Sequence, residues 1–442
     1  MDEISLDEGI EIALTALHAD RLALLCGAGL SMADPSNLPS AAQLASEAKR
    51  KHDAQYGASR PPLPAGIEEQ AEYFFQRGEL GTVYLRTFID PHAFARHPNA
   101  GHTAVADLLF VHAIQTAVST NVDTLIETAG TMLFGRIGAA IDKRGVAALL
   151  PDTAPLLKMH GCWAIDPENT VWAPGQLSAE PVASRITGSA EWLSVRLLDR
   201  DLIVVGYFTD WDYLNAVLDR TLGNVRPARV LIIDPNEGTT LAGKAPALHA
   251  LGARANSRFC HVRVSGAVFL ERLRSDFSLG FVRRVLHAGG QAYQDLTGAP
   301  PDPAWLEPVR IDVDDLWRAR RDLEGRFPNH PARDHAPPEE PALGLTILQL
   351  RARGAVPEGP YWLLHGQRVR ILRTPNQLLH LVEAAFTRET PPAVAPDMII
   401  AVGAESSPMP AHVVRGATPP SIVRGSSGRW FTRHDAVREL GL

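Results

Sequence analysis

The segment Arg-Leu-Ala-Leu-Leu-Cys-Gly-Ala-Gly-Leu-Ser, residues 21–31, decides the fold. Its first six residues predict a short strand buried on both faces, and the glycine loop 27–31 follows at once. Ser-Thr-Asn-Val-Asp at 119–123 and Lys-Met-His-Gly at 158–161 likewise follow apolar runs. Open α/β sheets bind ligands just beyond the carboxyl ends of their strands, so these three segments predict one shared site.

Strand and helix patterns alternate from the first residues to about residue 285. The predicted strands are Arg21–Cys26, Ala113–Val118, Leu156–Met159, Asp201–Val205, Ala228–Ile233 and Val262–Val264. The predicted helices are Leu6–Ala19, Ala41–His52, Ile67–Ile89, His102–Phe110, Thr124–Met132, Ala183–Leu198, Asp212–Leu222 and Ala267–Arg274. Strands that alternate with helices and are apolar on both faces predict an α/β fold with a doubly wound, Rossmann-like parallel sheet.

A chain of 442 residues is too long for one ordinary core, so two domains are expected. We predict a ligand-binding domain at 1–285, a connecting segment with a Pro-rich linker at 286–342, and a small α+β domain at 343–442. In the last domain we expect strands at Gly344–Leu350, Tyr361–Leu364, Arg368–Leu372 and Met398–Val402, and a helix at Asn376–Phe386.

Composition places the chain among soluble globular proteins, with 45% hydrophobic and 21% charged residues. No apolar run reaches a membrane-spanning length, and the acidic N-terminus does not resemble a signal peptide. Three cysteines provide neither a disulfide framework nor four zinc thiolates, so we expect a cytoplasmic protein. Residues 343–442 carry 11 Lys and Arg against 7 Asp and Glu, which is typical of a solvated surface; contact with nucleic acid or an acidic partner is the alternative.

The loop Gly27-Ala28-Gly29 lets backbone approach a pyrophosphate, and a helix N-terminus behind it would supply N–H groups. An ordinary tight turn is the alternative, because Met32 stands where a third glycine would complete the dinucleotide fingerprint. The loop continues through Ser31 to Pro39 before the next helix, which predicts an extended flap beside the ligand.

Asn121 and Asp123 are two residues apart in an extended segment, which places both side chains on one side. They could orient ribose hydroxyls or a water molecule, or they could cap the following helix. His160 precedes Gly161 and suits general-base chemistry, although a lone histidine is more often structural. His102 begins a helix and is expected to cap it or pack.

Two more strand ends carry candidate ligand contacts. Gly206-Tyr207 allows close backbone approach to a nucleotide, and Asp234 can accept hydrogen bonds from ribose hydroxyls. Turn formation is the alternative for both, since Asp234-Pro235-Asn236 is a typical turn sequence.

In this order and spacing, the segments resemble the sirtuin (silent information regulator) family over residues 15–280. The matching positions are Gly27, Ala28, Gly29 and Ser31 for the family's Gly-Ala-Gly-x-Ser loop, Asn121 and Asp123 for its Asn-x-Asp step, His160 and Gly161 for its catalytic His-Gly, and Gly206, Tyr207 and Asp234 for later strand ends. The resemblance implies NAD⁺ as the ligand of these residues, with Asn121, Asp123 and His160 as the catalytic group.

The chain departs from protein-deacetylating sirtuins in two places. It has Pro39-Ser40-Ala41-Ala42 where they carry Pro-Asp-Phe-Arg, and only Cys162 lies between His160 and Gly206, where they insert a four-cysteine zinc module. We therefore expect no zinc. The Lys-Met-His-Gly form, with Val171-Trp172 and 206–210 downstream, is similar to the bacterial antiphage-defence branch of the family.

Members of that branch hydrolyse NAD⁺ to nicotinamide and ADP-ribose on phage infection, so the resemblance implies an NAD⁺ hydrolase that acts by NAD⁺ depletion. It also implies a homo-oligomer or a partner such as a HerA-type ATPase or a short Argonaute, with the region after residue 341 used for assembly or sensing. The alternatives are an NAD⁺-dependent protein deacylase or ADP-ribosyltransferase, and a non-catalytic ADP-ribose-binding module.

Overall fold

The computed structural model describes residues 1–114, 116–150, 153–207, 212–255, 258–325, 339–374, 377–386, 394–406 and 428–442. It divides into two compact units, Met1–Leu273 and Arg274–Leu442, and each unit has its own sheet. Within the described residues, no helix combines the length and the apolar character needed to cross a membrane.

The first unit is built on one sheet of eight strands, all paired in parallel. Their spatial order is β1 (Asp2–Ile4), β8 (Arg258–Val262), β7 (Arg229–Ile233), β6 (Asp201–Val205), β2 (Leu22–Cys26), β3 (Thr116–Ser119), β5 (Ala154–Lys158) and β4 (Ile137–Ala140). After β2 the chain first adds strands on the β3 side and then returns to the β6 side. This confirms the predicted doubly wound α/β class and places the topological switch point at β2.

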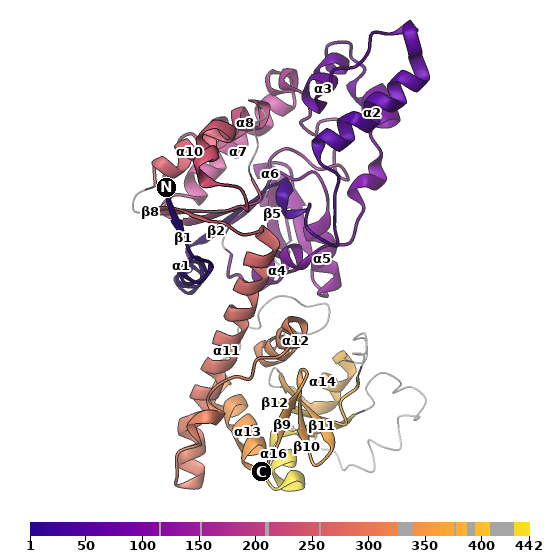
Figure 1. Cartoon of the computed structure of the whole chain (residues 1–442). Coiled ribbons are helices and arrows are strands. Elements are labelled where there is room, and N and C mark those ends of the chain that lie inside the picture. The colour runs from indigo at the N-terminus through magenta and orange to yellow at the C-terminus, as the bar shows by residue number, and fades with distance from the viewer. Residues whose placement is uncertain are drawn as a thin grey trace. The chain divides into compact units, whose positions relative to one another are not determined.

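Helices cover both faces of this sheet. Figure 1 shows α7, α8 and α10 together on one side, with α1 on the other. The helices of the unit are α1 (Leu6–His18), α2 (Ala41–Tyr56), α3 (Ile67–Phe75), α4 (Ala100–Phe110), α5 (Leu125–Met132), α6 (Lys143–Ala147), α7 (Val182–Arg196), α8 (Asp212–Leu222), α9 (Leu241–Lys244), α10 (Pro246–Ala253) and the start of α11 (Gly266–Thr297). Because both faces are covered, the central strands β2 and β6 are buried along their whole length, which explains their apolar sequences. Asp201, the first residue of β6, is the charged exception, and it pairs with Arg229.

Two predictions for the first unit were wrong in detail. The helix expected over 67–89 is broken: α3 ends at Phe75, Gly78 turns with φ +68°, and a π-helix follows at Leu80–Phe88. The break arises because only glycine adopts that backbone conformation without strain. The last strand lies at Arg258–Val262 rather than 262–264, and the short strands β1 and β4 were not predicted.

The second unit contains a five-stranded mixed sheet in the order β13 (Arg429–Thr432), β12 (Met398–Val402), β11 (Gln367–Arg373), β10 (Tyr361–Leu364) and β9 (Val356–Glu358). Its helices are the end of α11, α12 (Val313–Glu324), α13 (Glu340–Ala352), α14 (Leu379–Phe386) and α16 (Arg433–Leu440). The strand expected at 344–350 was wrong, because this stretch belongs to α13. Most of α13 is buried, and a helix that is apolar nearly all round cannot be distinguished from a buried strand by its pattern alone.

The domain boundary expected at 285 falls inside α11, which is continuous from Gly266 to Thr297. Phe281, Val285 and Leu286 of this helix pack in the core of the second unit with Leu343 and Ile347 of α13. The expected connecting segment, 286–342, therefore contains ordered structure, including α12. Residues 326–338 of the expected linker lie outside the described residues.

Candidate active site

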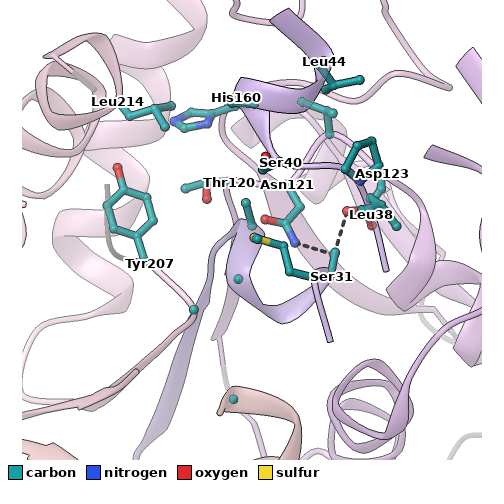
Figure 2. Close-up of a pocket in the computed structure, with 18 of the residues that line it drawn as sticks. Ser31, Leu38, Ser40, Leu44, Thr120, Asn121, Asp123, His160, Tyr207 and Leu214 are labelled. Atoms are coloured by element: carbon teal, nitrogen blue, oxygen red, sulfur yellow. Dashed lines mark hydrogen bonds between the residues drawn. The ribbon is translucent and has the colours of Figure 1, made fainter. Parts of the chain in front are cut away.

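A cavity of about 540 Å³ opens at the carboxyl edge of the first unit's sheet (Figure 2). Its lining brings together residues from the ends of five strands and the start of α11: Ala28, Gly29 and Ser31 after β2, Thr120, Asn121 and Asp123 after β3, His160 after β5, Gly206 and Tyr207 after β6, Asp234 after β7, and Ser265 and Gly266. All predicted site residues except Gly27 line this cavity. Residues 208–210, which were part of the family resemblance, lie outside the described residues.

The register of the central strands explains this convergence. Cys26 of β2 pairs with Ser119 of β3 and with Val205 of β6, and Ser119 pairs with Lys158 of β5. Four strands therefore end at the same level, and the segments that follow them enter the same space. The numbers of residues between these segments along the chain do not indicate that their strands end at the same level.

Gly27, Gly29 and Gly206 allow the loops after β2 and β6 to pack backbone against backbone. Gly27 N–H donates to Val205 O (2.8 Å) and Gly29 N–H donates to Gly206 O (2.9 Å). A methyl group on Gly27 would lie 2.6 Å from Gly206 O, and one on Gly29 would lie 2.9 Å from Gly206 Cα. Backbone-to-backbone packing thus requires glycine at these positions, and Gly27 acts behind the cavity rather than in its wall.

Replacing Gly206 by alanine is expected to destabilise the first unit. Gly206 has φ +64°, and a methyl group there would meet Gly29 and the backbone N of Leu30. The left-handed backbone alone costs about 1–3 kcal/mol for a residue with Cβ, and the clash adds to it. A lowered thermal unfolding midpoint is the expected readout. Gly243→Ala in α9 is the matched control, since nothing lies within 4 Å of a methyl group there; equal midpoints for the two variants would contradict the prediction.

Ser31 is the centre of a buried hydrogen-bond network (Figure 2). Its Oγ–H donates to Asp123 Oδ2 (2.8 Å), and its Oγ accepts from Asn121 Nδ2 (3.0 Å). The third partner is His102 Nε2 at 3.0 Å. His102 Nδ1 accepts from the N–H of Asn99, so Nε2 carries the proton and donates to Ser31. The arrangement uses all the hydrogen-bonding capacity of the Ser31 hydroxyl.

His102 is the residue whose role in the site the sequence missed. Its expected capping role is confirmed, because it forms a capping box with Asn99 at the start of α4. The bond to Ser31 joins residues 71 positions apart, and no local pattern indicates it. Burial lowers the pKa of His102 to about 4, against the opposing charge of Asp123, and keeps the ring neutral.

Asn121 and Asp123 combine the two roles that the sequence left open. Asp123 Oδ1 accepts from the N–H of Leu125 (3.0 Å) at the start of α5, while its Oδ2 belongs to the Ser31 network. Asn121 is fixed by its bond to Ser31, but its Oδ1 is buried without a partner among the described residues. A buried amide oxygen without a partner is costly, so this atom is ready to accept a hydrogen bond from a ligand or water.

His160 is 3% exposed and is held by its backbone: its carbonyl accepts from Val171 N–H (2.8 Å). Gly161 has φ +98°, and a methyl group there would lie 2.8 Å from Thr170 Cα, so this glycine serves local packing. Burial lowers the pKa of His160 to about 3, a hydrogen bond to the Thr120 backbone opposes this effect, and the Arg185 charge adds to it. The imidazole is neutral at pH 7 and can accept a proton.

Stability is expected to fall as the pH decreases from about 6.5 towards 4. In the folded chain His102 and His160 have pKa values of about 4 and 3, against 6.5 as the ordinary value. The unfolded chain therefore binds more protons in this window, and each histidine contributes about 1.4 kcal/mol per pH unit. Urea unfolding at pH 4.5 and at pH 7 measures this difference in the free energy of unfolding. A shallower pH slope is expected for the double variant His102→Gln, His160→Gln; an unchanged slope would contradict the assignment.

A second acidic residue, Asp234, also lines the cavity. Asp234 is 4% exposed, and its Oδ1 accepts from the backbone N–H and from Nδ2 of Asn236 (2.9 and 2.7 Å), so the expected turn is present. Its carboxylate also lines the cavity and can accept from a sugar hydroxyl. Among the described residues that line the cavity, Asp123 and Asp234 are acidic and none is Lys or Arg. A phosphate group bound here would therefore depend on backbone N–H groups and the N-terminus of α11.

An apolar wall also lines the cavity. It includes Leu38 and Pro39 of the flap that was predicted beside the ligand, whereas no motif indicated Leu44 and Ile67. It consists of Leu38, Pro39, Ala41, Leu44, Ile67, Phe94, Val122, Val171 and Trp172, from the flap after β2, from α2 and α3, and from loops. Trp163 packs behind it, with ring centroids 5.1 Å from Phe94 and 5.9 Å from Trp172. An apolar wall facing a few polar groups is typical of small-molecule sites.

No thiol or metal cluster adds to this chemistry in the part of the chain that the structure describes. Cys26, Cys162 and Cys260 are free and buried, and burial raises the pKa of the Cys26 thiol well above its ordinary range. No group of three or more His, Cys, Asp or Glu side chains is arranged to hold a metal ion among the described residues.

Comparison with known proteins adds similarity of fold only. No protein-family model and no curated protein matches the chain. Among solved structures, one of Sir2 with a p53 peptide and NAD⁺ is 15% identical, covers 60% of this chain and 96% of its own, and has a TM-score of 0.35. A Sir2 homologue in complex with NAD is 14% identical and covers 63% and 97%, also with a TM-score of 0.35. A Sir2 homologue mutant with ADP-ribose is 15% identical and covers 61% and 98%, with a TM-score of 0.33. TM-scores this low support no conclusion about the ligand or the reaction of this chain.

The class of protein is therefore defined by the chain's own fold and site. It is a doubly wound α/β protein with a cavity at the carboxyl edge of its parallel sheet, and the described lining includes a neutral histidine, two amides and two carboxylates.

Proposed function

We propose that the first unit is an NAD⁺ hydrolase that cleaves the nicotinamide–ribose bond and releases nicotinamide and ADP-ribose. One observation carries the proposal: Asn121, Asp123 and His160 meet in one cavity with the glycine loop and Asp234. The N-terminus of α11 offers backbone N–H groups to a pyrophosphate, the glycine loop lets the pyrophosphate approach the backbone closely, and Asp234 offers a carboxylate to the adenosine ribose.

In this proposal the role of each residue follows from its contacts and its protonation state. Asn121 Oδ1, which is without a partner among the described residues, accepts from the attacking water. The neutral imidazole of His160 accepts a proton from that water or from a ribose hydroxyl. The two carboxylate oxygens of Asp123 are already used by Ser31 and by the N–H of Leu125. Asp123 therefore acts through Ser31, whose hydroxyl holds the Asn121 amide in place.

The step balances without a further reagent. The water oxygen bonds to the ribose C1′ as the C1′–N bond to nicotinamide breaks, and the bond's electron pair neutralises the positive ring nitrogen. The water proton passes to His160 and then to solvent. Nicotinamide is a good leaving group, so positioning and exclusion of competing acceptors supply most of the catalysis.

We further propose that the hydrolase is a bacterial antiphage effector, on the strength of the sequence resemblance. A hydrolase that depletes NAD⁺ requires restraint. The second unit, none of whose described residues lines the cavity, is available to assemble the chain into an oligomer or to bind a partner. Co-purification with the product of a neighbouring gene and mass measurement of the assembly test this role.

One assay separates the hydrolase from its alternatives. The full chain is incubated with NAD⁺ alone and then with NAD⁺ and an acetylated peptide, and nicotinamide release is followed. Release without peptide is the expected result. Release only with peptide would favour a deacylase or transferase, and ADP-ribose binding without any release would favour a non-catalytic module.

A further inference from the structure

Lys158 is a buried lysine directly beneath the candidate site. It is 1% exposed and is one of only five lysines in the chain. It is the last residue of β5, two positions before His160, and it does not line the cavity. Burial of an ammonium group is costly unless all its protons are used, so its partners indicate what it does.

All three donors of Lys158 Nζ have a partner. One bonds to the backbone carbonyl of Asp123, one to Glu127 Oε1 (3.0 Å) and one to Cys162 Sγ (3.3 Å). These partners belong to the loop after β3, the first turn of α5 and the turn after His160. Burial alone would lower the pKa of Lys158, but the charges of Glu127, Cys162 and Asp123 raise it, so the group is an ammonium ion.

The ammonium lies where the two halves of the candidate site separate. The ladder between β3 and β5 ends at the bond from Met159 N–H to Ser119 O, and beyond it the two chains diverge towards Asn121 and His160. One backbone bond, Trp163 N–H to Val122 O, joins them again. The side chains of His160 and Lys158 also span this gap: His160 bonds to the Thr120 backbone, and Lys158 contacts Asp123 on one side and Cys162 on the other.

We propose that Lys158 is a positioning residue, which holds the 121–123 segment at a fixed distance from His160. The proposal rests on the hydrolase function proposed above. The Asp123 backbone is fixed by Lys158 while its side chain orients Ser31 and Asn121, so a shift at Asp123 moves the amide that holds the attacking water. A misplacement of about 1 Å at such a group costs about 10²-fold in rate.

Lys158→Met is the test, because methionine keeps the unbranched chain up to the ε position but has no ammonium donor. We expect kcat for nicotinamide release to fall about 10²-fold, with KM for NAD⁺ changed less than about three-fold. Hydrogen exchange of the amides at 120–127 should become faster, while exchange in β6 and β7 stays slow. Lys143→Met is the matched control: Lys143 pairs with Glu191 at the surface, and the wild-type rates are expected.

Unchanged kcat together with unchanged exchange at 120–127 would overturn the proposal. If exchange in β6 and β7 also becomes fast, Lys158→Met has failed to fold. Glu127→Gln, which removes one charged partner of Lys158, then tests the proposal by kcat for nicotinamide release and by hydrogen exchange at 120–127. If the wild-type chain releases no nicotinamide, the hydrolase function has failed, and exchange at 120–127 still tests the positioning role alone.

Discussion

Replacing His160 by alanine is expected to reduce nicotinamide release about 10²- to 10⁴-fold, which is the usual contribution of a positioned general base. Among the described residues that line the cavity, His160 is the histidine, and its imidazole is neutral at pH 7. The rate of nicotinamide release under saturating NAD⁺ measures the effect, and ADP-ribose affinity should change little, because the proposed role lies in the chemical step.

The matched control is His92→Ala, since His92 is exposed and outside the cavity lining. A second variant, His160→Gln, keeps more of the buried volume and guards against a loss caused by the cavity that alanine leaves. Full turnover by folded His160→Ala protein would remove this residue from the mechanism.

Replacing Asn121 by alanine is expected to lower kcat about 10²-fold while KM for NAD⁺ changes little. Alanine removes the amide oxygen proposed to hold the attacking water and the Nδ2 donor to Ser31. The loss should therefore appear in hydrolysis rather than in binding. Initial rates over a range of NAD⁺ concentrations separate the two.

Asn169→Ala is the control for this prediction. Asn169 lies in the segment after His160 and donates to Asp166, but it does not line the cavity. A loss confined to KM in the Asn121 variant would show that this amide binds NAD⁺ instead of organising the water.

The residues after β2, β3 and β5 show how far a sequence pattern predicts a site. A buried parallel strand is apolar along its length, so the end of the apolar run marks the carboxyl edge, and Asn121, Asp123 and His160 were identified in this way. The same reasoning failed for α13, where a buried helix has the same apolar composition as a buried strand, and for 67–89, where Gly78 interrupts an otherwise periodic pattern.

The sequence by itself determined the α/β class, the strand ends that carry polar residues and the residue types available there, because these depend on burial patterns within each element. Only the tertiary structure decided that His102 hydrogen-bonds to Ser31, that the backbones of Gly27 and Gly206 pack too closely for a side chain, and that Lys158 contacts both halves of the site. The physical reason is that hydrogen bonds and close packing depend on which strand ends lie side by side. Strand order and register set that arrangement, and they join residues whose separation along the chain carries no periodic signal.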